Sequence, residues 1–178
     1  MPVEIERKFL LRDARWRQAV TRSERLRQGY LVDAAAIGAG LARASVRVRL
    51  GEGQGWLNVK AARAGIARAE YESPLPAADA REMLDTLCCG VLEKIRHWVP
   101  VEDVCFEIDE FLGANAGLVV AELELPAIDA PFPRPPWLGA EVSALARYYN
   151  VALAARPYAQ WSEAERAATD AMTEASPC

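Results

Sequence analysis

The amino-acid sequence predicts a mainly β fold of the α+β class, in which an antiparallel sheet of eight strands can close into a barrel. Eight short segments alternate apolar and charged residues, which is the pattern of strands with two different faces. Glycine-containing turns separate several of these segments, so neighbouring strands can reverse direction and pair. About eight strands is also the number that can close around one small ligand.

The expected strands occupy most of the first 126 residues. They span residues 3–11, 25–32, 44–51, 55–62, 67–75, 90–99, 104–112 and 118–126. Gly51, Gly53 and Gly55 mark a tight connection between the third and fourth strands, and Gly65 marks the next connection. We therefore expect one hairpin between the third and fourth strands and another between the fourth and fifth.

Three helices are expected beside the strands, at residues 14–20, 76–89 and 139–150. The third follows a proline-rich loop at residues 130–139. The tail can form one more helix, because Ser162 is a good N-cap and the glutamates after it favour a helix N-terminus.

Length and composition are those of an ordinary globular protein, with 178 residues, 26% charged and 52% hydrophobic. We expect one domain at residues 1–159, followed by a C-terminal helix or frayed tail at 160–178. The net charge of -4 argues against a nucleic-acid-binding surface. No apolar run approaches the roughly 18 residues of a membrane span, and Glu4 and Glu6 precede any apolar run, so we expect a cytoplasmic location without a secretory signal.

Zinc and disulfide chemistry are disfavoured by the residue counts. His97 is the only histidine, which excludes histidine-rich zinc sites. The four cysteines lack paired CxxC spacing, so reduced thiols are expected.

The charged residues of each expected strand fall on one face. In the first strand, Glu4, Glu6 and Lys8 share a face, while Ile5, Arg7 and Phe9 share the other. Later strands repeat the pattern with the basic residues Arg47, Arg49, Lys60, Arg68, Lys94 and Arg96 and the acidic residues Glu70, Glu72, Glu107, Asp109, Glu122 and Glu124. Charged strand faces are usually solvated, but the scarcity of Ser, Thr and Gln at these positions favours a charged interior.

Such an interior predicts a site for a metal–polyphosphate complex. Carboxylates about 4 Å apart repel by about 4 kcal/mol at an effective dielectric constant near 20, so they need cations or protons between them. Sites built only of carboxylates suit Mg²⁺ or Mn²⁺, and arginine and lysine beside them suit phosphate chains. No P-loop or GxGxxG motif is present, so charged side chains are the only phosphate-binding feature that the sequence shows.

Seven charged motifs follow one another along the chain: the ExExK of "VEIERKF", then "VRVR", "LNVK", "EYE", "EKIR", "FEIDEF" and "AELEL". In this order they resemble the CYTH superfamily, or triphosphate tunnel metalloenzymes, and the resemblance extends from Glu4 to "ARPYA". The "EIERKFL" and "WLGAEVS" segments are most similar to small bacterial tripolyphosphatase-type members. The resemblance implies a closed eight-stranded antiparallel β-barrel, or tunnel, with helices packed outside and charged side chains from every strand inside.

The resemblance also implies roles for individual residues. Glu4, Glu6, Glu122 and Glu124 resemble metal ligands. The acidic lining is completed by Glu70, Glu72, Glu107 and Asp109, which would share in a second metal site or in positioning the water. The residues that resemble phosphate-binding groups are Lys8, Arg47, Arg49, Lys60, Arg68, Lys94 and Arg96, while Tyr30 is either a further tunnel residue or a structural one. Direct catalytic roles are expected for Glu4, Glu6, Lys8, Lys94 and Asp109. Asn58 and Ser143 stand where threonine is common.

The expected reaction is hydrolysis of inorganic triphosphate to pyrophosphate and phosphate with one or two Mg²⁺ or Mn²⁺ ions. Three alternatives stay open: a hydrolase or cyclase acting on an organic triphosphate such as ATP or thiamine triphosphate, a noncatalytic polyphosphate-binding module, and a sandwich whose charges face solvent. The expected partner is a small anionic substrate, with no nucleic acid and no membrane. A homodimer is compatible with the sequence.

Overall fold

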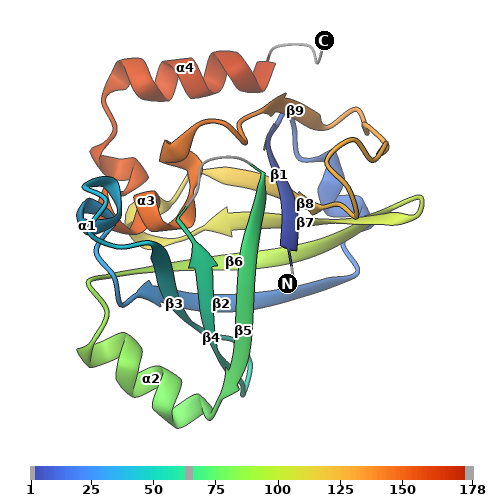
Figure 1. The fold of residues 1–178 in the computed structure, drawn as a ribbon. Coiled ribbons are helices and arrows are strands. Elements are labelled where there is room, and N and C mark those ends of the chain that lie inside the picture. Colours follow the sequence, from blue (N-terminus) through green and yellow to red (C-terminus); the bar gives the residue numbers. More distant parts are fainter. Residues whose placement is uncertain (1–2, 63–65, 175–178) are drawn as a thin grey trace.

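Nine strands form one antiparallel sheet that closes on itself in the computed structural model, which describes residues 3–62 and 66–174 (Figure 1). Eight of them form a ring in the order β5-β4-β3-β2-β6-β7-β8-β1, and β1 pairs with β5 to close it. The ninth strand, β9, pairs with β1 beside the ring. The prediction of a closed eight-stranded barrel is confirmed, and a sandwich with solvent-facing charges is excluded.

The ring strands lie where the alternating segments predicted them. They are β1 (Val3–Leu11), β2 (Arg22–Tyr30), β3 (Ala44–Leu50), β4 (Gly55–Ala61), β5 (Ala67–Leu75), β6 (Gly90–Val101), β7 (Val104–Phe111) and β8 (Val119–Glu124). Both predicted hairpins, β3–β4 and β4–β5, are present. The turn expected at Gly65, Cys178 and the last residues of the tail, 175–178, lie outside the described residues.

Short helices and 3-10 turns connect and cover the strands. They are η1 (Arg15–Ala19), α1 (Ala34–Gly38), α2 (Ala77–Thr86), η2 (Gly113–Asn115), η3 (Ala146–Tyr148), α3 (Asn150–Ala155), η4 (Tyr158–Gln160) and α4 (Glu163–Glu174). α2 confirms the helix predicted at residues 76–89. α4 begins with the predicted cap: the Glu165 N–H donates to the Ser162 hydroxyl at 3.3 Å, and the Ser162 N–H donates to the Glu165 carboxylate at 2.8 Å. None of the helices in the described ranges has the length and apolar character needed to cross a membrane.

Two helix predictions need correction. The helix predicted at residues 139–150 is wrong, because Leu138–Glu141 forms β9 and α3 begins only at Asn150. β1 has an unpaired edge beyond β5, and β9 supplies the backbone hydrogen bonds that this edge needs. The helix predicted at residues 14–20 is a single 3-10 turn.

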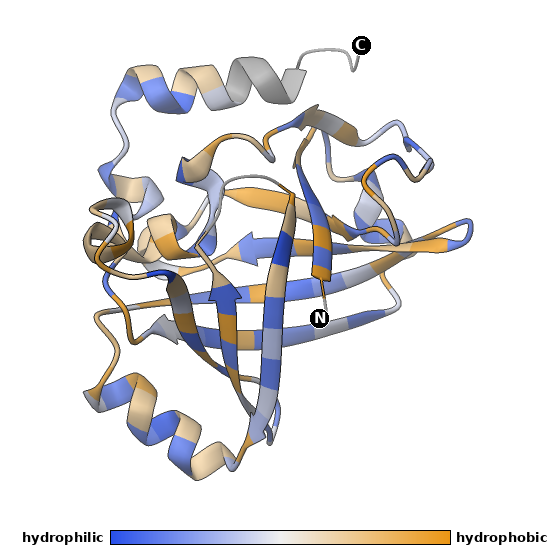
Figure 2. Ribbon diagram, in the orientation of Figure 1, coloured by the Kyte–Doolittle hydropathy of each residue, from blue (hydrophilic) through white to orange (hydrophobic). Residues whose placement is uncertain are grey.

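Apolar side chains on the outward face of the ring form the core. Figure 2 shows hydrophilic and hydrophobic residues alternating along the strands. α2 covers one part of this face, where Ala80 and Leu84 pack on Val48. Loops add to this cover, as where Trp137 of the proline-rich loop meets Phe106 edge-on at 5.2 Å. The prediction of helices packed outside the barrel is therefore confirmed, and loops complete the cover.

The inward face changes from charged to apolar toward one end of the barrel. Leu10, Leu92 and Val120 share the inward face with the charged residues of their strands, and they belong to a buried cluster with Tyr148 and Leu153. This cluster fills one end of the barrel and leaves the charged interior at the other.

Candidate active site

Two neighbouring cavities are lined by the inward-facing charged side chains. The wide cavity, of about 1150 Å³, is lined by carboxylates and three arginines, namely Glu4, Glu6, Glu70, Glu72, Glu107, Glu122, Glu124, Arg47, Arg49 and Arg96. The narrow cavity, of about 50 Å³, is lined chiefly by cations and polar groups, including Lys8, Arg47, Lys60, Arg68, Tyr30 and Glu6. Because Glu6 and Arg47 line both, the two cavities adjoin.

Arg96 of β6 organises the centre of the barrel. Its guanidinium donates to both carboxylate oxygens of Asp109 on β7, each at 2.7 Å, and to Glu122 on β8 at 2.5 Å. It also contacts Glu107. Burial alone would lower the pKa of Arg96, but these carboxylates, Asp109 and Glu122 first, raise it well above its ordinary value. Arg96 is therefore a fixed positive charge.

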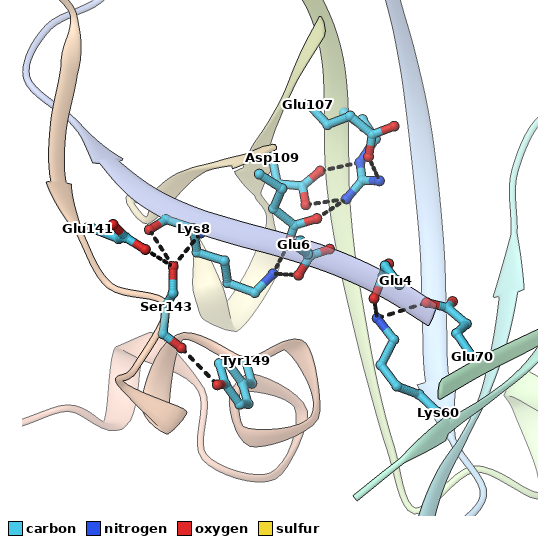
Figure 3. A network of polar contacts seen from close by, with 12 residues as sticks. Glu4, Glu6, Lys8, Lys60, Glu70, Glu107, Asp109, Glu141, Ser143 and Tyr149 are labelled. Atoms are coloured by element: carbon cyan, nitrogen blue, oxygen red, sulfur yellow. Dashed lines mark hydrogen bonds and ion pairs between the residues drawn. The ribbon is translucent and has the colours of Figure 1, made fainter. Parts of the chain in front are cut away.

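Lys8 of β1 joins the same network through Glu122, and Figure 3 shows its side chain beside Glu6. Its ammonium nitrogen lies 2.7 Å from Glu6 and also contacts Glu122. Burial opposes the charge of Lys8, but Glu122 and Glu6 raise its pKa above the ordinary value. Burial likewise opposes ionisation of Glu122, yet the cations around it hold its pKa well below the usual range. Both groups are thus ionised at neutral pH.

A second cluster joins the closing strands β1, β4 and β5. Lys60 contacts Glu4 and lies 3.1 Å from one carboxylate oxygen of Glu70, while the other Glu70 oxygen accepts a hydrogen bond from Asn58. Burial and the charge of Glu6 raise the pKa of Glu4 to about 7. Burial also acts on Glu70, but the hydrogen bond from Glu4 and the charge of Lys60 hold its pKa at about 2. Glu4 and Glu70 therefore share one proton at mildly acidic pH.

The rim of the wide cavity carries looser contacts and an aromatic ring. Arg49 pairs with Glu72 at 2.9 Å. The Trp98 indole N–H donates to Glu107 at 3.1 Å, and the Arg22 guanidinium lies 4.4 Å from the centre of the Trp98 ring. Burial and the neighbouring carboxylates, Glu107 first, raise the pKa of Glu124.

Aromatic residues border the narrow cavity. The Arg68 guanidinium lies 5.0 Å from the centre of the Tyr149 ring. Tyr30 is buried and accepts a hydrogen bond from the Gln28 amide at 3.3 Å, and burial raises its pKa to about 12. Tyr30 is therefore a neutral phenol that faces the cations of this cavity.

Lys94 and Asp109 are the two predicted site residues that line neither cavity. They contact each other and are almost completely enclosed, with side-chain exposures of 1% and 0%. Burial and the charge of Arg96 lower the pKa of Lys94 to about 8. Both residues lie behind the wall of the site, where Asp109 holds the Arg96 guanidinium and Lys94 pairs with Asp109.

The family model of the CYTH domain matches residues 2–158, which is most of the chain. The chain belongs to the CYTH family. It is 40% identical over 164 residues to the inorganic triphosphatase of Acetivibrio thermocellus, with 92% of this chain and 100% of that protein covered. It is 32% identical over 155 residues to the inorganic triphosphatase of Nitrosomonas europaea, with 85% of this chain and 96% of that protein covered.

Solved structures agree with this assignment. The crystal structure of the inorganic triphosphatase NE1496 matches with a TM-score of 0.62 at 30% identity, covering 87% of this chain and 96% of that one. A putative adenylate cyclase from Bacillus halodurans matches with a TM-score of 0.54, covering 72% of this chain and 84% of that one; at 16% identity the likeness concerns the fold alone.

Several residues of this CYTH domain reach the site although the sequence analysis assigned them no role there. Trp98 lines the wide cavity, Asn58 lines the narrow one, and Gln28 is fully buried beside Tyr30. All three share the inward face with a charged or polar residue two positions away, so strand alternation was the signal that could have identified them.

The carboxylates of this CYTH domain offer the oxygen ligands that Mg²⁺ and Mn²⁺ prefer. Within residues 3–62 and 66–174, no three acidic, histidine or cysteine side chains are already gathered closely enough to hold an ion. Lysine and arginine side chains stand between the carboxylates, as Lys60 does between Glu4 and Glu70. The donor chemistry therefore fits a hard cation, provided that these ion pairs open.

Proposed function

We propose that this CYTH protein is an inorganic triphosphatase that hydrolyses triphosphate to pyrophosphate and phosphate inside its barrel. The observation that carries the proposal is the closed ring itself, which gathers cations and carboxylates from seven of its eight strands around two adjoining cavities. Two relatives that bear the name inorganic triphosphatase align with most of this chain, which supports the same activity here.

In this proposal the cations hold the phosphate chain. Lys8, Lys60 and Arg68 face the narrow cavity, and Arg47 lies where the two cavities adjoin. Lys8, Lys60 and Arg47 can each exchange a carboxylate partner for a phosphate oxygen and keep a charge-assisted hydrogen bond. Arg49 and Arg96 face the wide cavity and are placed to neutralise charge that builds up on the phosphates during bond cleavage.

The same exchange frees carboxylates for a divalent cation. Glu4, Glu6, Glu122 and Glu124 would hold one or two Mg²⁺ or Mn²⁺ ions, and Glu70, Glu72 and Glu107 would complete the acidic lining, with Asp109 buried behind it. A bound ion would neutralise phosphate charge and lower the pKa of the attacking water. Since the pKa of Glu4 is about 7, metal binding should strengthen as pH rises through that value.

Lys94 and Asp109 would contribute by orienting Arg96. Asp109 accepts two hydrogen bonds from the guanidinium, which fixes its plane. Lys94 neutralises part of the Asp109 charge from behind. The catalytic roles predicted for these two residues therefore become positioning roles in this proposal.

A phosphate-release assay with tripolyphosphate tests the proposal. The wild-type protein should release phosphate with Mg²⁺ or Mn²⁺ and should stop when the ions are chelated. Glu4→Ala and Lys8→Ala should lower turnover by orders of magnitude, whereas Glu82→Ala, an exposed substitution on α2, should not. Equal turnover in all four proteins would refute the assignment.

One observation keeps an organic triphosphate as the second candidate. Trp98 lines the wide cavity and offers an aromatic surface near the acidic rim. ATP and thiamine triphosphate belong in the same release assay, and Trp98→Ala should impair their hydrolysis more than that of tripolyphosphate if the organic group stacks there. Tight triphosphate binding without turnover in any metal would instead indicate a binding module. The cytoplasmic location and the homodimer stay predictions, which cell fractionation and light scattering can check.

A further inference from the structure

Lys8 lies where β1 changes its partner strand. On the same edge of β1, the Glu6 N–H donates to the Ile66 carbonyl at 3.0 Å, and Phe9 is the first residue to pair with β9. The pairing with β5 ends at Ile5 and the pairing with β9 begins at Phe9, so neither strand pairs with Lys8 on this edge. A backbone amide in this buried position needs a partner from elsewhere.

The hydroxyl of Ser143 supplies that partner. It accepts a hydrogen bond from the Lys8 N–H at 2.9 Å, while the Lys8 carbonyl accepts one from the Val142 N–H at 2.8 Å. Ser143 is itself buried. Its side chain therefore completes the backbone pairing at the residue whose ammonium group reaches the site.

Neighbouring groups hold Ser143 in place. The Ser143 hydroxyl donates to the Glu141 carboxylate at 2.8 Å, which leaves its oxygen lone pairs to accept from Lys8. Arg7 holds the same carboxylate at 3.1 Å from the outer face of β1. The Tyr149 hydroxyl donates to the Ser143 carbonyl at 2.8 Å (Figure 3), and its ring packs against Arg68 of the narrow cavity.

We propose that Ser143 is a positioning residue for triphosphate hydrolysis, because it fixes the backbone of Lys8 and so directs the Lys8 ammonium group at the substrate. The inference rests on the proposed function. Small displacements of a positioned group can cost large factors in rate. A residue that acts through Lys8 should therefore affect turnover more than it affects folding.

Kinetics of Ser143 variants test this role. Ser143→Ala should lower kcat for tripolyphosphate about tenfold with a smaller change in KM, and Ser143→Thr, which keeps the hydroxyl, should restore kcat to within about threefold of the wild type. Ser23→Ala removes a hydroxyl that bonds His97 at 2.7 Å outside the site, and it should leave kcat unchanged. A wild-type kcat in Ser143→Ala, or a folded Ser143→Thr without rescue, would overturn the proposal.

A double-mutant cycle separates positioning from general stability. In a Lys8→Arg background, adding Ser143→Ala should cost less than about threefold, because the residue being positioned is already replaced. An equal tenfold loss in both backgrounds would mean a merely structural role. If Ser143→Ala does not fold, Tyr149→Phe removes only the hydrogen bond to the Ser143 carbonyl, and it should lower kcat about threefold; an unchanged kcat in that variant would count against the proposal.

Amide hydrogen exchange provides a readout that does not depend on activity. The peptide containing Lys8 should exchange faster in Ser143→Ala than in the wild type, whereas Ser23→Ala should leave it unchanged. If the Lys8 peptide exchanges faster in Ser143→Ala but the wild-type protein is inactive, the proposed function is refuted while the contact between Ser143 and Lys8 stands. An active wild-type protein with unaltered exchange and kcat in Ser143→Ala would refute the positioning role alone.

Discussion

Replacing Arg96 with methionine should destabilise the protein strongly. The side chain is only 9% exposed, and it bonds Asp109 twice at 2.7 Å and Glu122 at 2.5 Å. Without it, Lys8 and Lys94 are left to balance four carboxylates in the centre of the barrel, namely Glu6, Glu107, Asp109 and Glu122. Removing one partner of a buried ion pair costs about 3–5 kcal/mol. Domain stabilities are about 5–15 kcal/mol, so this loss is a large fraction of the total.

Urea unfolding followed by circular dichroism measures the effect as a free energy of unfolding. The matched control is Arg25→Met, which removes an exposed partner of Glu93, since the Arg25 side chain is 69% exposed. Surface pairs contribute about 0–1 kcal/mol, so the control should change little. The loss in Arg96→Met should also shrink as pH falls, because protons can replace the missing cation. Losses that agree within about 1 kcal/mol in the two variants would refute the reasoning.

Two further substitutions test other parts of the structure. Glu4→Gln mimics the protonated acid. Because the pKa of Glu4 in the folded protein, about 7, lies above the ordinary 4.5, the wild type loses stability as pH rises through 7. The variant should therefore gain free energy of unfolding relative to the wild type between pH 5 and about pH 8 in urea unfolding, and a constant difference would contradict the raised pKa. Gly55→Ala places a Cβ atom 2.4 Å from the Ala80 Cβ atom of α2, so it should cost about 1–3 kcal/mol in thermal unfolding. Gly38→Ala in α1 meets open space and should be neutral or stabilising. Equal losses of stability in the two glycine variants would show that α2 moves aside without cost, and would contradict the expected clash.

Much of the site could be predicted because strand alternation is a local property of the chain. Glu4, Glu6 and Lys8 share a face in any β-strand, and the same holds for Glu122 and Glu124. The helical spacing at residues 139–150 was misleading. β9 pairs with the part of the β1 edge that β5 leaves uncovered, and where that part lies is decided only when the ring closes.

The sequence by itself therefore determined which charges face the interior, since the two-residue period of a strand follows from backbone geometry. Only the tertiary structure decided how deep each charge lies and which partner it has. Lys94 and Asp109 share the inward face of their strands with Arg96 and Glu107, yet they lie behind the cavity wall. Ser143 reaches Lys8 across 135 positions of sequence. Such contacts depend on the register in which the ring closes, and no local pattern in the chain encodes that register.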